Sequence, residues 1–388
     1  MSASFLVKGW CPNALRPMRS GDGLLVRIKP PGGRLSACDA SEIAKLAARY
    51  GNGVIDISNR ANLQVRGVRE QSYDALLSSL NELRLIDANA DAEARRNVIV
   101  TPFAAVDDLA HTLAEELSRA LTKPNAPRLP EKFGFAIDTE GAPILLSAPA
   151  DIRFERASDG SLVCAADGAE TGAIITPDTA VEAATALSQW FLETGGASDG
   201  RGRMAAHIAR GTSLPERFTA VSRVMGASFQ PGPGQTSQGW LVGLAFGQMS
   251  TQTLAALARL GDLQLTPWRM VLIVGFDQRP ELRDVITDAD DPLNRVVACV
   301  GAPSCPQAHQ PTRSLARMLA VHVPNGSQLH VSGCAKGCAQ PRPTPRTLVA
   351  SPTGFSLIHH GRAGDAPVCA PVSAEALIAN PARINEAV

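Results

Sequence analysis

The sequence predicts an α+β protein built from two related halves that face each other across a pseudo-two-fold axis. One strand–turn–helix–strand plan occurs twice, over residues 21–67 and over residues 239–276. A larger mixed segment follows each copy, and four cysteines lie in the second of these segments. The chain has 388 residues, which is enough for two or three domains with sizeable cores. Two related halves point to a binding site at their junction.

Hydrophobic periodicity and turn residues define the first copy. Its helix is amphipathic, because Ile43, Leu46 and Ala47 fall on one face at helical spacing. Glycine and proline mark the two turns. In order along the chain we expect a strand over residues 24–28, a turn at 30–33, a helix over 41–50, a glycine-rich stop at 51–53 and a returning strand over 54–67.

The second copy follows the same plan with different residues. We expect a strand over 240–244, a turn at 246–248, a helix around 254–257 and a returning strand over 263–276. In the two returning strands, Asn59-Arg60 answers Trp268-Arg269 and Gly67 answers Gly275, with one residue of slippage. Chance similarity between two short segments is the alternative explanation.

Weaker signals mark the elements outside the two copies. Residues 195–202 and 230–238 have the glycine- and proline-rich composition of linkers. Residues 204–223 between them are expected to be helical, and so are the residues near 107–121.

Four cysteines form two closely spaced pairs near the C-terminal end. Thiolates are soft ligands, and four of them suit either a tetrahedral zinc ion or an iron–sulfur cluster. Zinc knuckles usually close each pair over two to four residues, whereas five residues separate the first pair here. The wider spacing favours a 4Fe–4S cluster, with zinc and four unrelated buried thiols as alternatives. The candidate ligands are Cys299, Cys305, Cys334 and Cys338, with the flexible backbone of Gly301, Gly333 and Gly337 beside them.

Composition disfavours several classes of partner. Lys plus Arg and Asp plus Glu both number 37, so the chain has no net charge to attract nucleic acid or an anionic membrane. The N-terminal residues lack the apolar core of a secretory signal, and no apolar run is long enough to span a bilayer. Eight cysteines without such a signal indicate a reducing, cytoplasmic location. Four scattered cysteines are interpreted as small buried hydrophobes: Cys11, Cys38, Cys164 and Cys369.

Basic residues gather in two stretches of this neutral chain. Residues 8–34 carry six Lys or Arg side chains, from Lys8 to Arg34, against one acidic residue. In the returning strand of the first copy, period two places Arg60, Asn62, Gln64 and Arg66 on one face. Such a face is often only the solvated side of a sheet. The functional interpretation is a carboxylate clamp, because guanidinium and amide groups donate hydrogen bonds to carboxylates.

Several motifs together resemble the sulfite and nitrite reductase superfamily. The Cys-x5-Cys and Cys-x3-Cys pairs are similar to its cluster motif, and residues 58–67 resemble its tetrapyrrole-binding strand. Residues 96–98 and 129–133 also resemble its motifs, and an internal repeat is a feature of its fold. The resemblance covers most of the chain and implies two ferredoxin-like half-domains and two larger α/β domains for the cluster and the tetrapyrrole. The implied ranges are 1–80 and 236–285 for the half-domains, and 90–225 and 290–388 for the larger domains, the last with the cysteines.

Within that superfamily, the chain resembles the precorrin-3B synthases of the aerobic cobalamin pathway. This resemblance implies an oxygen-dependent monooxygenase that hydroxylates precorrin-3A at C20 and closes an acetate side chain as a γ-lactone. It also implies dioxygen as co-substrate and an external protein that delivers NADH-derived electrons. The motifs that carry the resemblance are Cys11-Pro12-Asn13, Arg16-Pro17-Met18 and residues 20–27, 30–35 and 332–339.

The chain departs from the reductases at one informative place. It keeps matches to the superfamily's anion site at Arg60, Arg96 and Lys132, but the lysine expected two residues later is Gly134. Loss of a proton-donating lysine disfavours the reduction of sulfite, so siroheme is not expected. A siroheme-dependent sulfite or nitrite reductase is the first alternative function, and a non-catalytic iron–sulfur tetrapyrrole-binding protein is the second.

The resemblance also implies the parts of a site. The cluster would pass single electrons, and a mononuclear non-haem iron is associated with the family. The sequence does not locate ligands for that iron, because its histidines form no helix-face pair, and no catalytic residue is assigned. The residues expected to bind the carboxylates of the substrate are Arg27, Lys29, Arg60, Asn62, Gln64, Arg66, Arg96 and Lys132.

Overall fold

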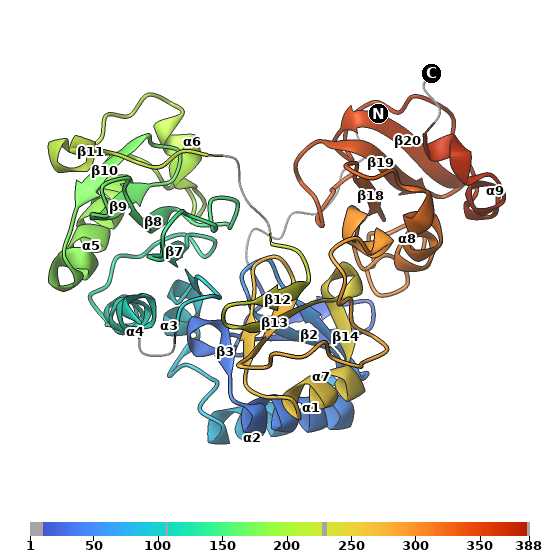
Figure 1. Ribbon diagram of the computed structural model, residues 1–388, viewed down its shortest axis with the longest axis horizontal. Coiled ribbons are helices and arrows are strands. Elements are labelled where there is room, and N and C mark those ends of the chain that lie inside the picture. The colour runs from blue at the N-terminus through green and yellow to red at the C-terminus, as the bar shows by residue number, and fades with distance from the viewer. Residues whose placement is uncertain (1–10, 106–107, 227–230, 386–388) are drawn as a thin grey trace.

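The computed structural model describes residues 11–105, 108–226 and 231–385, so the expectations that fall on Lys8, Asp107 and Gln230 lie outside it. In this part of the chain, the strands form four sheets, and helices accompany them. This mixture agrees with the predicted α+β class. Two five-stranded sheets carry the two copies of the repeat, and a larger unit stands above them on each side (Figure 1).

The two copies of the repeat correspond element by element. The first copy contains β1 (Met18–Ser20), β2 (Gly23–Ile28), β3 (Arg34–Leu35), α1 (Ala37–Tyr50), β4 (Val54–Ile57) and β5 (Leu63–Val68). The second copy contains β12 (Gly234–Thr236), β13 (Gly239–Gly243), β14 (Gln248–Ser250), α7 (Thr251–Ala258), β15 (Leu263–Leu265) and β16 (Met270–Val274). The expected internal repeat is therefore confirmed. The segment expected as a linker at 230–238 contains β12, which pairs with β13.

Each copy gives one short strand to the sheet of the other. The strand orders are β1-β2-β5-β4-β14 and β12-β13-β16-β15-β3. Gln248 of β14 lies opposite Asp56 of β4, and Arg34 of β3 lies opposite Gln264 of β15. One continuous apolar core then includes residues of both copies, such as Leu63 and Leu263. The two copies therefore form one structural unit.

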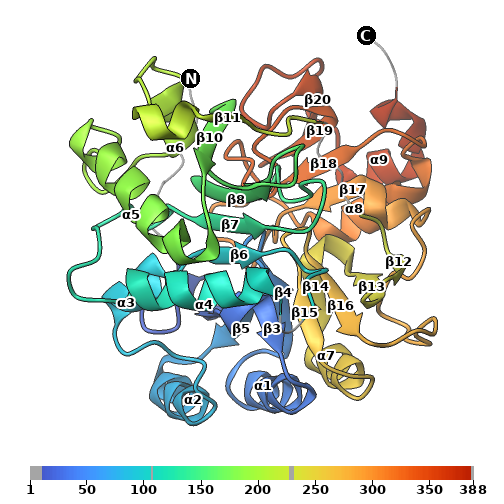
Figure 2. The same ribbon diagram turned by 60° about the vertical axis from the view of Figure 1, so that its left-hand side comes forward.

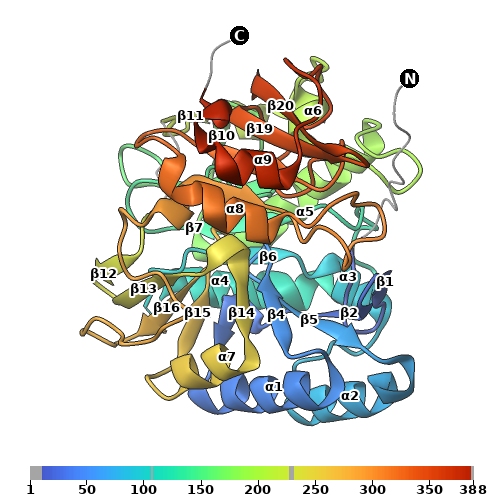
Figure 3. The ribbon, with the colours of Figure 1, turned by 90° about the vertical axis from the view of Figure 1, so that its right-hand side faces the viewer.

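The helices of both copies begin in the same way and cover the same face. Ser36 Oγ accepts a hydrogen bond from Asp39 N before α1, and Ser250 Oγ accepts one from Thr253 N before α7, each at 3.0 Å. Buried alanines on α1 let α7 pack against it. Helices α1, α2 (Glu70–Glu82) and α7 lie side by side below the sheets, so the opposite sheet face turns toward the two larger units (Figures 1 and 3).

Each expected returning strand is a hairpin with a tight turn. In the first copy, Ser58 N donates to Asn62 O at 2.9 Å and Ala61 N donates to Ser58 O at 3.1 Å. Ala61 adopts a φ of 53° and Arg269 a φ of 63°, at matching places in the two turns. The expected strand face is therefore wrong for Arg60 and Asn62, which lie in the turn.

The second turn fixes the register between the copies. Thr266 N donates to Met270 O and Arg269 N donates to Thr266 O, which repeats the bonds of the first turn. Arg60 therefore corresponds to Trp268, and Ala61 corresponds to Arg269. The one-residue slippage between the two sequences lies in this turn. The position equivalent to Arg60 is Trp268, which is one residue before Arg269.

The internal symmetry extends to the two larger units. In each, three parallel strands are followed by an antiparallel one: β6, β7, β8 and β9 in the first, and β17, β18, β19 and β20 in the second. The strands of the first unit are β6 (Val98–Val100), β7 (Phe135–Asp138), β8 (Ile152–Arg156), β9 (Leu162–Ala166), β10 (Thr171–Ile174) and β11 (Val221–Ser222). Those of the second are β17 (Val296–Ala298), β18 (Leu329–Ser332), β19 (Thr344–Ser351) and β20 (Gly354–Gly361).

The helices of the larger units include one correction. Residues 204–223 are not one helix: the α-helix α6 covers only Met204–Ile208 and a short 3-10 helix covers Glu216–Thr219. Gly211, with a φ of 83°, and Pro215, which lacks a backbone donor, interrupt the helix between them. None of the helices in the described ranges is long and apolar enough to cross a bilayer. The remaining helices, visible in Figures 1 and 2, are α3 (Ala90–Arg95), α4 (Leu109–Leu121), α5 (Pro177–Glu193), α8 (Arg313–Leu319) and α9 (Ala374–Ala379).

Candidate functional site

The four clustered cysteines meet at one end of a parallel strand pair. Cys299 follows β17 directly, and Cys334 and Cys338 follow β18, which lies beside β17. Gly333 N donates to Cys299 Sγ at 3.1 Å. Burial raises the pKa of the Cys334 thiol, and the neighbouring thiols of Cys299 and Cys305 raise it further. The thiols therefore influence one another although the chain separates the two pairs.

The four thiols do not form a compact single-ion site in the part of the chain that the structure describes. Across these residues, no three His, Cys, Asp or Glu side chains form a group that would hold one metal ion. The thiols around a cube-shaped cluster bind separate irons and lie further apart than the ligands of one ion. The loops pack closely at Gly333, because a Cβ there would lie 2.7 Å from Ala308 Cβ and 3.3 Å from Cys299 Sγ. Gly301 and Gly337 take φ values of 70° and 62° in the same cysteine loops.

Two arginines of the first copy carry buried donors without partners. Arg27 lies on β2 opposite Gln64 of β5, and Arg60 lies in the hairpin turn. Both residues are less than a tenth exposed. Arg27 Nε and Arg60 Nη1 have no hydrogen-bond acceptor in the part of the chain that the structure describes. Such donors are costly to bury unless a ligand satisfies them.

The two arginines lie in a polar environment that is shielded from solvent. Burial lowers the pKa of Arg27, and it lowers the pKa of Arg60 to about 10, with the nearby thiol of Cys11 opposing both shifts. The interpretation of the face as the solvated side of a sheet is therefore wrong. Cys11 is half-buried beside two guanidinium groups, so it is not a core hydrophobe, and Cys38 and Cys369 are exposed. Of the four scattered cysteines, only Cys164 is buried.

Lys29 and Arg96 already have internal partners. Lys29 Nζ donates to Glu93 O at 2.6 Å and to Asn97 Oδ1 at 3.1 Å. Burial, together with the nearby charge of Arg27, lowers the pKa of Lys29 to about 7. Arg96 binds both carboxylate oxygens of Asp87 and donates to the carbonyl of Lys29. These contacts join β2 to the segment that leads into β6.

Arg66 is part of a second internal network. Its guanidinium binds Asp22 at 2.9 Å and Asp56 at 3.1 Å, and Arg313 of α8 also binds Asp56 at 3.1 Å. Ser20 Oγ, which accepts from Arg66, donates to Ser304 O in the cysteine loop. Arg66 therefore links the first copy to the cysteine loop.

The remaining predicted residues differ in exposure. Asn62 is buried in the turn, Gln64 is half-buried beside Arg27, and Lys132 is exposed. The carbonyl of Lys132, rather than its side chain, accepts a hydrogen bond from Arg60 Nη2 at 2.6 Å. A Cβ on Gly134 would lie 2.6 Å from Arg60 Nη1. The missing side chain at position 134 thus makes room for the guanidinium of Arg60.

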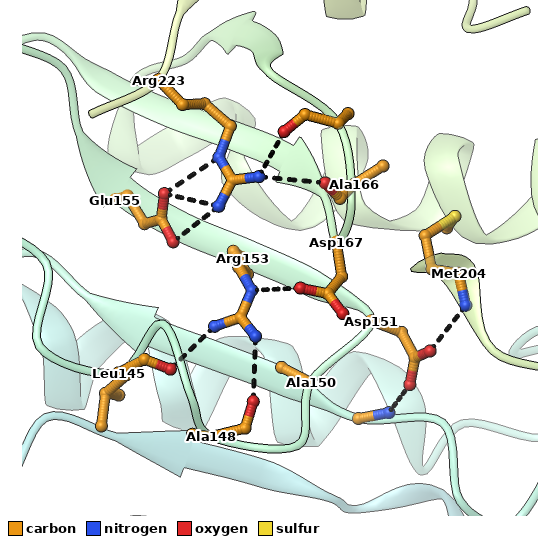
Figure 4. A network of polar contacts seen from close by, with 12 residues as sticks. Leu145, Ala148, Ala150, Asp151, Arg153, Glu155, Ala166, Asp167, Met204 and Arg223 are labelled. Carbon is orange, nitrogen blue, oxygen red and sulfur yellow. Dashed lines mark hydrogen bonds and ion pairs between the residues drawn. The ribbon is translucent and has the colours of Figure 1, made fainter. Parts of the chain in front are cut away.

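Asp151 holds the loop that contains Gly134 in place. The sequence patterns did not identify this residue. Its carboxylate accepts from Gly134 N at 2.9 Å, from Met204 N at 2.8 Å and from Arg203 Nε at 2.9 Å. Figure 4 shows Asp151 beside the ion pairs Arg153–Asp167 and Arg223–Glu155 in the same unit. Nothing in the local sequence marks Asp151, because its partners come from two other segments of the chain, at Gly134 and at Arg203-Met204. Asn97, by contrast, belongs to the recognised motif 96–98.

The histidines offer no further metal site. His207 is bonded to Thr194 at 2.7 Å and to Arg210 at 2.8 Å. His330 is fully buried on β18, and burial followed by the charge of Arg269 lowers its pKa to about 4. Within the described ranges, neither joins acidic or cysteine side chains in a group that fits an ion. The residues present do not fit the expected mononuclear iron.

Comparisons with known proteins agree with this architecture. The family model described as the nitrite/sulfite reductase ferredoxin-like half domain matches residues 16–83. A solved structure of the NirA protein of Mycobacterium tuberculosis has a TM-score of 0.61 at 18 % identity, over 87 % of this chain and 75 % of that one. This likeness concerns the fold, and it confirms the predicted fold class.

Two curated relatives identify the family. A ferredoxin–nitrite reductase of Synechococcus elongatus is 24 % identical, over 86 % of this chain and 77 % of its own length. A precorrin-3B synthase of Sinorhizobium sp is 30 % identical, over 93 % of this chain and 84 % of its own length. Both of these relatives are oxidoreductases. The chain therefore belongs to the precorrin-3B synthase family, within the sulfite and nitrite reductase superfamily.

Proposed function

We propose that this protein is an oxygen-dependent monooxygenase of cytoplasmic, aerobic cobalamin biosynthesis that converts precorrin-3A to precorrin-3B. The ring gains a hydroxyl at C20, and an acetate side chain closes on the macrocycle as a γ-lactone. One oxygen atom of dioxygen enters the product and the other leaves as water, so an external donor must supply two electrons and two protons. NADH-derived electrons would come through a partner protein, because the chain has no dinucleotide-binding glycine motif.

One observation carries this proposal beyond family membership. On the sheet face that turns toward the larger units, Arg27 and Arg60 hold buried donors that find no acceptor within residues 11–105, 108–226 and 231–385. The substrate carries many carboxylates, and a carboxylate would satisfy both guanidinium groups. Each such charge-assisted bond contributes roughly 1.5–3 kcal/mol. Lys29 and Arg96 would position these arginines through their own internal partners rather than bind substrate directly.

The cysteine quartet supplies the redox part of the proposal. Cys299, Cys305, Cys334 and Cys338 would hold a 4Fe–4S cluster, which passes single electrons when bound. The network of Arg66, Asp22 and Ser20 holds the loop of Ser304 against the first copy. This contact would keep the electron source at a fixed distance from the bound macrocycle. We assign no step to a mononuclear iron.

The difference at Gly134 supports the oxygenase over a sulfite reductase. The space that a lysine would occupy there is filled by the guanidinium of Arg60. A donor that is fixed by the Lys132 carbonyl suits the binding of a carboxylate more than delivery of protons to a small anion. Siroheme-dependent reduction of sulfite or nitrite is therefore the rival outcome of the test.

The test is a labelled-oxygen reaction. Protein purified without air is given precorrin-3A, a reductant and dioxygen labelled with ¹⁸O, and the product is analysed by mass spectrometry. We expect one labelled oxygen atom in the product. A bound siroheme with turnover of sulfite or nitrite, and no labelled product, would replace the proposed reaction with that of the reductases.

A further inference from the structure

The internal symmetry gives the Arg27–Arg60 face a counterpart in the second copy. Ile28 of β2 lies opposite Leu63, the first residue after the first turn, and Val242 of β13 lies opposite Val271, the first residue after the second. The registers and the matching turns then assign each position. Arg27, Lys29, Arg60 and Gln64 correspond to Leu241, Gly243, Trp268 and Leu272.

The counterpart face is apolar and borders a large cavity. Leu241, Met270 and Leu272 form a buried cluster with Trp268 at its edge. A cavity of about 910 Å³ opens over this face, which lies within the range of known small-molecule sites. Its walls come from the first larger unit, the second copy and the second larger unit, including Ala150, Arg203, Gly243, Trp268, Gln340 and Arg342.

The residue that corresponds to Lys29 lines this cavity. In the first copy, Lys29 reaches Asn97. Gly243 stands at the matching position in the second copy and lines the cavity, and it packs closely there, because a Cβ at this position would lie 3.0 Å from Pro233 Cγ and 3.1 Å from Ile286 Cβ. None of the eight residues expected to bind substrate lines the cavity, although Asn59, next to Arg60, does. The cavity is therefore separate from the Arg27–Arg60 face.

The wall of the cavity suits a flat, conjugated ligand. The ring of Trp268 stacks on that of Phe103, with centroids 6.2 Å apart and an interplanar angle of 26°. The indole Nε1 of Trp268 is buried and has no acceptor among the described residues. An aromatic surface with an unsatisfied donor favours a planar molecule that carries hydrogen-bond acceptors.

The charges of the cavity suit an anion. Arg153 is paired with Asp167 and Arg203 with Asp151, so these guanidinium groups are balanced. Arg269 Nη2 donates to the carbonyl of Ala339 at 3.4 Å, the nearby charge of Asp56 opposes the burial that lowers the pKa of Arg269, and Arg342 is exposed at the wall. Two cationic groups thus face a cavity whose lining includes a single carboxylate, that of Asp167. Carboxylates on the ligand would complement them.

We propose that this cavity is a second binding site, for a planar conjugated polycarboxylate of tetrapyrrole size. The ligand stacks on the Trp268 wall and places carboxylates at Arg269 and Arg342. The site itself rests on the cavity and the internal symmetry, whereas the choice of a tetrapyrrole rests on the proposed function. Ala339 and Gln340 lie in its wall directly after Cys338, so the second ligand would sit next to the cysteine loop.

The experiment counts bound ligands with coproporphyrin III, a soluble tetracarboxylate porphyrin, by isothermal titration calorimetry on the whole protein. We expect two equivalents to bind wild-type protein. The exposed substitution Arg342→Glu should weaken one of them at least ten-fold, and Trp268→Leu should weaken the same one. Arg60→Ala should weaken the other. Arg383→Glu, an exposed charge reversal far from the cavity lining, is the control and should bind as wild type.

The outcomes separate this inference from the proposed function. If Arg342→Glu and Trp268→Leu both titrate as wild type, or if wild type binds one equivalent that Arg60→Ala abolishes, the second site does not exist. That result leaves the labelled-oxygen assay of the main reaction untouched. If no porphyrin binds at all, the ligand class is wrong. Two equivalents without oxygen transfer to precorrin-3A would support the second site and overturn the proposed reaction.

Discussion

Because of Lys29, the free energy of unfolding should increase with pH between about 7 and 10.5, a range in which a lysine of ordinary pKa stays charged. Its pKa is about 7 in the folded chain against 10.5 for an ordinary lysine, because burial disfavours the charged amine and Arg27 repels it. Between these two values the unfolded chain binds more protons than the folded one. Stability therefore increases with pH through this window, and the cost of burying a charge is largest below pH 7.

The size of the effect follows from the linkage relation. One proton held only by the unfolded chain gives a slope of about 1.4 kcal/mol per pH unit. From pH 7.5 to pH 9.5, the free energy of unfolding should rise by about 2–3 kcal/mol through Lys29 alone.

The assay is urea unfolding followed by circular dichroism at both pH values, on wild type and on Lys29→Met. The variant loses the hydrogen bonds to Glu93 O and Asn97 at every pH, but it should also lose the rise. Lys45→Met is the control, because Lys45 is exposed and its contact with Glu42 raises its pKa, so it stays charged over the range. Parallel pH profiles for wild type and Lys29→Met would refute the lowered pKa.

Three further substitutions test the site. Cys334→Ser should remove the visible absorption of the cluster; a full cluster in the variant would exclude Cys334 as a ligand. Arg60→Ala should weaken tetrapyrrole binding by roughly 1.5–3 kcal/mol, measured by titration, with the cluster spectrum intact; unchanged affinity would remove Arg60 from the clamp. Gly134→Ala should push the Arg60 guanidinium from the Lys132 carbonyl and reduce that affinity, with Gly226→Ala, where the Cβ meets nothing within 4 Å, as control; equal affinity of both variants would show that position 134 is not a constraint.

The repeat could be predicted from the sequence because its signals are local. Glycine and proline turns and apolar periodicity mark β2, α1 and their counterparts without reference to the rest of the chain. The hairpin turn at Ser58–Asn62 escaped detection because it contains no glycine or proline, and Ala61 takes its positive φ under the constraint of the surrounding structure. Strands β3 and β14 have two and three residues, too few for a pattern, so the exchange between the copies could not be foreseen.

The basic residues of the site show the same division. Pattern and resemblance selected eight side chains, but they could not say which of them keep free donors. That depends on Asp87, Asp22 and Asp56, which neutralise Arg96 and Arg66. A carboxylate and a guanidinium meet because the fold brings their strands together, and the sequence around Arg27 and Arg60 does not differ in kind from that around Arg66.

By itself the sequence determined the superfamily, the internal repeat and the four cysteines, since each is encoded in residue types at short, fixed spacings. Only the tertiary structure decided that, of the eight residues expected to bind substrate, Arg27 and Arg60 have buried donors without an acceptor among the described residues. It also decided that Arg60 corresponds to Trp268 and that a cavity opens over the second copy. The physical reason is that burial, ion pairing and empty space are properties of residues that meet from distant parts of the chain. The linear pattern specifies the chemical groups of each side chain. Its neighbours in space determine whether those groups are satisfied within the fold or remain available to a ligand.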